Sequence, residues 1–317
     1  MEEYSAGMSA VFALLAALQI SASARLLIRQ APALRHAHGP AGGNWARGKA
    51  QWILLLVPAS VARATALLLL LADMVAKADG GVPAQIAFLF QAASLFDAAA
   101  SWLFYSVKVG VIAAWAASRR GPGPHWGAFL VGAATLSLVM ALSLAVTVTL
   151  SLHYGAACMQ THAVLPCEQR QAWFATFHLA LVLISLLTTL IALGVALSTA
   201  RLRERTRGGD ADNGPASGVF GGRAFVPLSQ EAAALEHAAH LCTVSFCWWT
   251  LFNVYAALRA ALLVQSTPTE VAVAVAANCL LSELIPSGAI SLALSRHVAR
   301  LSRHSRHAPA RPGAYAY

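Results

Sequence analysis

The chain has 317 residues, of which 58% are hydrophobic and only 11% are charged, whereas about 25% of the residues in a soluble domain are charged. One globular core cannot bury this much apolar side chain, so the composition excludes an ordinary soluble domain and indicates a protein that spans a membrane. The net charge of +9 becomes informative through its distribution along the chain.

The apolar residues fall into seven segments, each long enough for a transmembrane helix of about 20 residues. We expect helices because lipid offers the backbone no hydrogen-bonding partner, and because the alternating pattern of barrel strands is absent. The N-terminal sequence MEEYSAG is acidic and carries no cleavage signal, so we interpret the first segment as a signal anchor. The predicted spans are roughly 8–29, 51–73, 84–117, 126–152, 171–198, 237–264 and 271–295.

The positive charges predict the orientation of this bundle. Sixteen of the 22 Lys and Arg residues lie in the first, third and fifth loops and the C-terminal tail. Only two lie in the second and fourth loops, and the N-terminus and the sixth loop have none. Because basic loops stay on the cytosolic side, the sequence predicts a luminal or extracellular N-terminus and a cytosolic C-terminus.

The sequence predicts one seven-helix domain over residues 1–300, with two basic cytosolic segments. The loop 199–236 is rich in Gly and polar residues, so we expect a flexible linker, and residues 301–317 form a basic tail. Ordinary anchoring of the bundle is the simplest role for these charges, with anionic lipids and a cytosolic protein as alternative partners. No metal, cofactor or nucleic-acid motif is present, and we expect none of these partners.

Charged residues also occur inside the predicted spans, where each costs roughly 2.5–3.5 kcal/mol unless it is paired or faces the bundle interior. Arg63 in the second span, Asp97 in the third and Glu283 in the seventh all lie near the middle of the membrane. Arg63 is therefore the expected partner of Glu283, and Arg259 in the sixth span is the second choice. Lys108 lies nearer the cytosolic end of the third span, where its long side chain can reach the headgroups.

The order of these charges raises an alternative class of protein. Arg63 and Asp97 follow one another in the second and third spans, and Arg259 and Glu283 do so in the sixth and seventh. This order fits a parallel repeat of three helices on either side of a central one, which is a plan used by transporters.

A proline follows Glu283 in the segment CLLSELIPSGAISLALSR. Pro286 has no amide hydrogen, so it frees the carbonyl of Ser282, which Ser282 itself, Ser287 or a buried water can satisfy. The pairing of Glu283 with Arg63 is open to two interpretations, a packing salt bridge or a ligand, ion or switch site. A neutral, protonated Glu283 is a third, because burial disfavours the charged form.

Two cysteines, Cys158 and Cys167, share the polar loop CMQTHAVLPC on the predicted luminal side. That side is oxidising on the secretory route, which favours a local disulfide, and two free thiols are the alternative.

Two spans resemble those of a known family. The sixth, CTVSFCWWTLFNVYAALRAALL, follows a basic loop, and the seventh, LLSELIPSGAISLAL, carries an acid-x-x-Pro-Ser pattern at Glu283, Pro286 and Ser287. With VARATALL around Arg63 and ARLLIRQ ending the first span, they are similar to the plant tobamovirus multiplication family of seven-helix proteins. The third span departs from the family pattern, since FQAASLFD contains no proline and leaves Asp97 without a counterpart. The tail also lacks the family's paired prolines.

The resemblance implies a receptor-like bundle on a vacuolar or lysosome-like endomembrane. In land plants, proteins of this family serve as a membrane platform for the replication proteins of tobamoviruses. The expected function is therefore a non-enzymatic scaffold or receptor-like adaptor that acts through its basic cytosolic face. A transporter of a small solute or ion is the alternative. Retinal is not expected, because the seventh span contains no lysine for a Schiff base.

Overall fold

The computed structural model describes residues 2–37, 44–79, 83–120, 164–209, 230–262 and 268–293, with shorter pieces between 134 and 149. Over these residues the chain is helical and contains no β-strand. The helices are α1 (Glu2–Ala37), α2 (Asn44–Ala78), α3 (Pro83–Arg120), α5 (Val164–Gly209), α6 (Gln230–Ala261) and α7 (Pro268–Asn278). Helix α7 continues into the π-helical segment η1 (Cys279–Leu284), which is followed by α-helix over residues 285–293.

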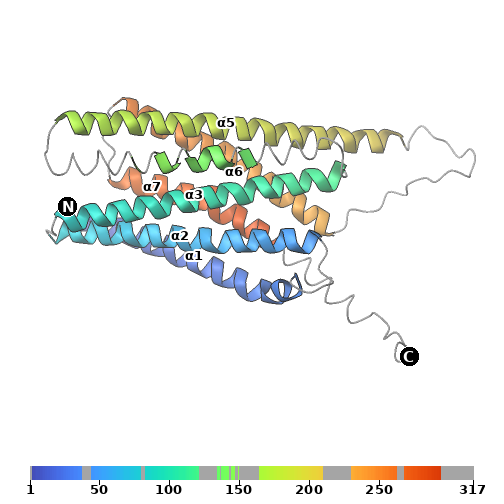
Figure 1. The fold of residues 1–317 in the computed structure, drawn as a ribbon, viewed down its shortest axis with the longest axis horizontal. Helices are drawn as coiled ribbons and strands as arrows, with labels where there is room; N and C mark the ends of the chain where they lie inside the picture. Colours follow the sequence, from blue (N-terminus) through green and yellow to red (C-terminus); the bar gives the residue numbers. More distant parts are fainter. Residues whose placement is uncertain are drawn as a thin grey trace, which may run out of the picture.

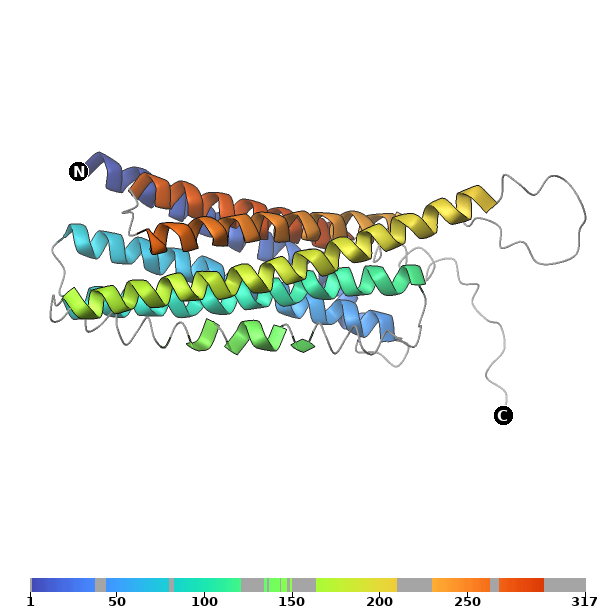
Figure 2. The ribbon, with the colours of Figure 1, turned by 90° about the horizontal axis from the view of Figure 1, so that it is seen from above.

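The long helices lie side by side in an elongated bundle (Figure 1). Helix α2 packs between α1 and α3, α5 packs along α6, and α3 contacts α6. Helix α7 and η1 close the bundle by contacting α1 and α6. The view from above shows α5 extending past its neighbours at its C-terminal end (Figure 2).

Six of the described helices are long and apolar enough to cross a membrane. The fourth predicted span, 126–152, is described only in part, as the shorter apolar helix Ser137–Val146. That helix lies against α3, where the Ser137 hydroxyl is 2.7 Å from that of Ser106. The six long candidate spans are Met8–Ile28, Leu55–Ala76, Phe88–Ala116, His178–Ser198, Ala233–Arg259 and Val273–Ala293.

Helix α5 differs from the expectation for the loop 199–236. The helix continues through the basic sequence RLRER to Gly209, and α6 already begins at Gln230. The cause is local, since Leu, Arg and Glu are all good helix formers and, after Gly194, the next glycines of α5 are Gly208 and Gly209 at its end. The tail 301–317 lies outside the described residues.

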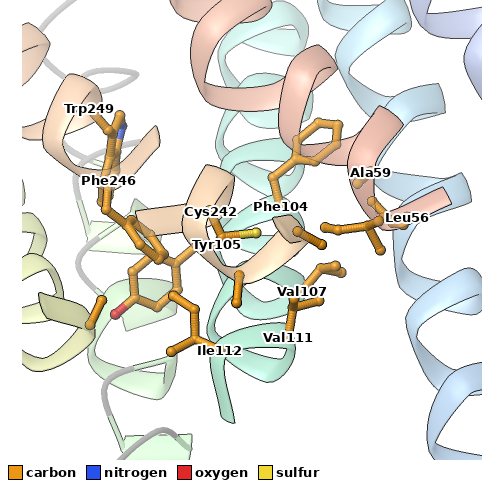
Figure 3. Packing of buried hydrophobic residues seen from close by; sticks show 14 of the residues in the cluster. Leu56, Ala59, Phe104, Tyr105, Val107, Val111, Ile112, Cys242, Phe246 and Trp249 are labelled. Carbon is orange, nitrogen blue, oxygen red and sulfur yellow. The ribbon is translucent and has the colours of Figure 1, made fainter. Parts of the chain in front are cut away.

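Two apolar clusters form the interior. The larger one contains residues of α2, α3, α5 and α6 together with Leu26 of α1 and Ile290 in the helix after η1, and it includes the aromatic group shown in Figure 3. There the ring of Tyr105 lies 5.5 Å from that of Phe246, edge to face, and 5.9 Å from that of Trp249. The smaller cluster joins α1 and α2 to Cys279 in η1.

The outer surface of the bundle is also apolar. Leucines such as Leu14, Leu183, Leu190 and Leu251 expose more than half of their surface. Exposed apolar surface on this scale is unfavourable in water but suits contact with lipid tails. Burial and exposure together therefore describe a helical membrane bundle.

Candidate functional site

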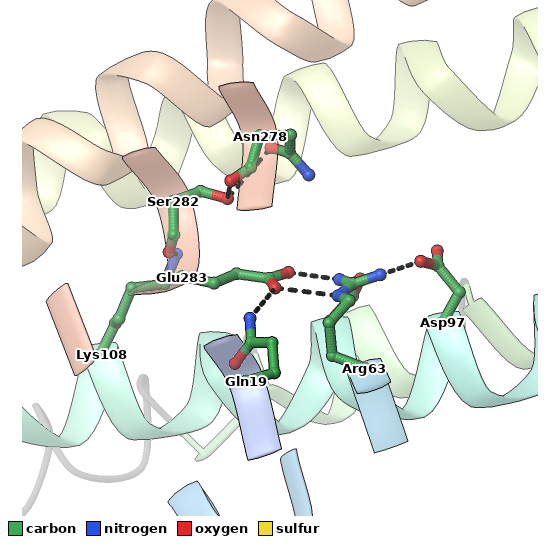
Figure 4. A network of polar contacts seen from close by, with 8 residues as sticks. Gln19, Arg63, Asp97, Lys108, Asn278, Ser282 and Glu283 are labelled. Atoms are coloured by element: carbon green, nitrogen blue, oxygen red, sulfur yellow. Dashed lines mark hydrogen bonds and ion pairs between the residues drawn. The ribbon is translucent and has the colours of Figure 1, made fainter. Parts of the chain in front are cut away.

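The interior contains a network of charged side chains, and its centre is the contact between Arg63 of α2 and Glu283 of η1 (Figure 4). Arg63 Nε donates to Glu283 Oε2 over 2.8 Å, and Arg63 Nη2 contacts Glu283 Oε1, so the guanidinium holds the carboxylate with two nitrogens. Both residues are buried, with exposed fractions of 4% and 3%. This is the pair expected from their matching depth in the membrane.

Three further side chains complete the contacts of this pair. Arg63 Nη1 contacts the carboxylate of Asp97 on α3, and Arg63 Nη2 donates to the hydroxyl of Ser101 over 3.0 Å. On the other side, Gln19 of α1 donates to Glu283 Oε2 over 3.3 Å. The network therefore ties α1, α2, α3 and η1 together at one depth. Asp97 lies at its edge, with 54% of its side chain exposed.

The helix that carries Glu283 changes form at this point. Residues Cys279–Leu284 are π-helical, and the amide of Ile285 donates to the carbonyl of Leu280 five residues earlier. π-Helical turns inside α-helices are rare and often occur at functional sites. Pro286, which is buried, follows directly and has no amide hydrogen to offer the carbonyl of Ser282.

Lys108 of α3 satisfies that freed carbonyl. Its ammonium group donates to the Ser282 oxygen over 3.2 Å and lies 4.6 Å from the centre of the Phe246 ring. Neither serine suggested from the sequence takes this role. The Ser282 hydroxyl instead bonds to Asn278, at 2.6 Å from its carbonyl oxygen and 3.0 Å from its side-chain oxygen. Ser287 is only partly buried.

The expectation that Lys108 extends toward the headgroups is wrong. The side chain is buried, with an exposed fraction of 5%, because it faces α6 and η1 rather than the outer surface. The Ser282 carbonyl and the ring of Phe246 give the buried ammonium group of Lys108 some of the stabilisation that water would give it.

Lys108 and Glu283 line the same small cavity. Its volume is about 20 Å³, and its walls come from α3, α6, α7 and η1. A cavity of this size holds about one water molecule, whereas pockets for organic ligands measure about 300–1,000 Å³. The remaining lining residues are Ser101, Phe104, Tyr105, Trp249, Asn278 and Ser282.

Arg259, expected in the charge network, lies elsewhere. It occupies the last turn of α6 and donates to Glu270 in the first turn of α7 over 3.0 Å and to Tyr255 over 3.1 Å. The two ends of the short connection between α6 and α7 bring these groups together. Arg259 and Arg63 therefore occupy unlike environments, which gives no support to a repeat that equates them.

Polar contacts also join α3, α5 and α6 beside the network. The Tyr105 hydroxyl lies 2.8 Å from that of Thr188, and His178 Nδ1 lies 3.3 Å from the side-chain oxygen of Asn253. The first of these contacts holds Tyr105, which belongs with Trp249 to the aromatic wall of the cavity.

The predicted disulfide lies outside the described side chains. Cys158 is not among the described residues, and Cys167 falls in the first turn of α5, where side chains are not described. The described cysteines Cys242, Cys247 and Cys279 are free thiols.

Sequence reasoning missed Gln19, Ser101, Asn278 and the role of Lys108. A signal existed for Gln19, which is a lone amide in the middle of an apolar first span. Polar side chains at that depth tend to hydrogen-bond across helices. Neither a family model, nor a curated protein, nor a solved structure matches the chain.

Proposed function

We propose that the protein is a non-enzymatic scaffold or receptor-like adaptor with seven membrane spans, held in one conformation by the Arg63–Glu283 pair. Six spans are the long apolar helices, and the seventh is the segment 126–152, which includes the helix Ser137–Val146. The distribution of basic residues supports a luminal N-terminus and a cytosolic C-terminus.

The single observation that carries this proposal is the position of the Arg63–Glu283 contact. It joins a buried guanidinium on α2 to a carboxylate on a π-helical segment, and Gln19 and Asp97 extend the contact to α1 and α3. Breaking such a pair leaves an uncompensated buried charge, so the arrangement strongly favours one packing of four elements. A protein that presents a fixed cytosolic surface to partners requires such a single favoured packing of its helices.

Transport is the second candidate, and one observation favours it. A cavity lined by Lys108 and Glu283 adjoins an irregular helical segment near the membrane midplane. Transporters bind their substrates in such places. The cavity holds about one water molecule, however, so this conformation has room for an ion at most.

The cellular setting rests on the resemblance of the sixth and seventh spans to the tobamovirus multiplication family. It supports a vacuolar or lysosome-like endomembrane and a cytosolic protein as the partner. The basic residues after α5 and in the tail supply the attractive surface for such a partner or for anionic lipids.

Reconstitution of the purified protein into liposomes separates the two candidates. The scaffold proposal expects radiolabelled ions and small solutes to enter no faster than into empty liposomes. Uptake that disappears in Glu283→Gln, while Arg259→Met still transports, would establish transport and refute the scaffold. The Arg259 variant is the matched control, because its ion pair with Glu270 lies outside the network.

Partner recruitment tests the adaptor directly. In plant cells, the tagged full chain should co-purify with a tobamovirus replication protein from membranes, and deletion of residues 301–317 should weaken this association. Equal recovery of the replication protein with an unrelated multi-pass membrane protein would count against the proposal.

A further inference from the structure

The cavity between Lys108 and Glu283 is small, and these two lining side chains are buried and opposite in charge. We propose that it binds one ordered water molecule, which accepts a hydrogen bond from the Lys108 ammonium and donates one to the Glu283 carboxylate. This site is independent of whether the protein is a scaffold or a transporter.

The first reason is the incomplete hydrogen bonding of Lys108. An ammonium group has three N–H donors, and among the described residues the Ser282 carbonyl is its one hydrogen-bond acceptor. The rings of Phe246 and Trp249, with centres at 4.6 and 6.0 Å, supply weaker electrostatic contacts. Buried donors without an acceptor are costly, and an ordered water is a common partner for them.

The second reason is the spare acceptor capacity of Glu283. A carboxylate has about four acceptor positions. Its oxygen Oε2 accepts from Arg63 and Gln19, and Oε1 accepts from Arg63. Among the described contacts this leaves one position on Oε1, on a residue that lines the cavity.

The third reason is that the charges on the walls disfavour ions. A cation in the cavity would lie close to Lys108 and near Arg63, whereas an anion would lie against Glu283. A neutral water molecule avoids both repulsions, because its oxygen faces the ammonium group and one of its hydrogens faces the carboxylate. The volume of about 20 Å³ suits one such molecule.

A bound water would extend the charge network by one member. The contacts already run from Asp97 through Arg63 to Glu283, and from Lys108 to the Ser282 carbonyl. The water joins the two parts, so α3 contacts the network at both of its ends. Water-mediated contacts stabilise a structure nearly as well as direct hydrogen bonds.

Radiolytic hydroxyl-radical footprinting of the full-length protein in detergent or nanodiscs tests the site. Radicals form from bound water itself, so a buried side chain beside an ordered water is oxidised. We expect Tyr105, which lines the cavity, to be oxidised several-fold more than Trp115, although both have exposed fractions of 1%. Oxidation of Tyr105 no greater than that of Trp115 would overturn the proposal.

A matched pair of variants removes the remaining ambiguity. Ser101→Thr keeps the hydroxyl that Arg63 needs and adds a methyl group at the cavity wall. It should abolish the excess oxidation of Tyr105. Ser106→Thr, on the same helix but outside the cavity lining, should leave the excess oxidation of Tyr105 unchanged. Persistence of the excess in Ser101→Thr would show that the water lies elsewhere.

Exchange of the buffer ions separates water from an ion. Replacement of sodium by N-methylglucamine, or of chloride by gluconate, should leave the labelling of Tyr105 unchanged. A several-fold change with either replacement would assign the cavity to that ion and overturn the proposal.

Discussion

Substitution of Arg63 by methionine should destabilise the protein more than substitution of Glu283 by glutamine. Arg63→Met leaves a buried carboxylate whose one remaining direct donor among the described residues is Gln19, at 3.3 Å. Glu283→Gln leaves an arginine that still contacts Asp97 and Ser101. Loss of Arg63 therefore leaves a buried charge with fewer remaining contacts than loss of Glu283 does.

The magnitudes follow from the partners that remain. An uncompensated buried charge costs about 3–5 kcal/mol, so Arg63→Met belongs in that range. Glu283→Gln should cost about 1–3 kcal/mol, because its amide oxygen can still accept one hydrogen bond from Arg63. Double-mutant cycles within a membrane bundle average only about 0.6 kcal/mol per polar contact, which lowers both values but keeps their order.

Reversible unfolding of single and double variants in mixed micelles of SDS and a mild detergent measures these values. The double variant should cost less than the two singles together, with a coupling above about 0.5 kcal/mol. Arg259→Met combined with Glu283→Gln is the control, and these two should add, because Arg259 pairs with Glu270 outside the network. Additive effects for Arg63 and Glu283 would refute the reasoning.

Three further outcomes are expected. Lys108→Met should destabilise the protein by about 1–3 kcal/mol, because the Ser282 carbonyl loses the donor that Lys108 supplies. In the Lys108→Met variant, Pro286→Ala should recover stability by restoring an amide hydrogen. An equal effect of Pro286→Ala in the wild-type protein and in the Lys108→Met variant would contradict this account. Protease added to sealed, right-side-out endomembrane vesicles should remove a C-terminal tag, whereas a protected tag would reverse the proposed orientation. If Cys158 and Cys167 are bridged, neither should react with an alkylating reagent until reductant is added, and labelling of both in denaturant without reductant would exclude the bridge.

Depth in the membrane could be predicted from the sequence because an α-helix rises by a constant 1.5 Å per residue. Counting from the ends of the spans was enough to pair Arg63 with Glu283. It also explains why Arg259, several residues nearer one face, was only the second choice, and in the structure it pairs with Glu270.

Direction around the helix axis could not be predicted in the same way. The spans are apolar on all sides, so periodicity does not identify the face that looks inward. Lys108 illustrates this limit, since its position in the sequence suits either the headgroups or the interior. Only the packing of α3 against α6 and η1 places it inside. The freed carbonyl of Ser282 was predictable from Pro286, but its donor on another helix was not.

The π-helical turn at Cys279–Leu284 also changes the phase of the last helix. In an uninterrupted α-helix, residues 11 apart lie on nearly the same side, because each residue turns the chain by about 100°. Cys279 and Ile290 are separated in this way, and both are buried, Cys279 in the smaller cluster and Ile290 in the larger one. A π-turn holds the equivalent of one extra residue and shifts the helical phase by about a quarter of a turn. The last helix thus has two registers, so a substitution scan along it should show two apolar stripes offset from one another, with the change of stripe at Glu283.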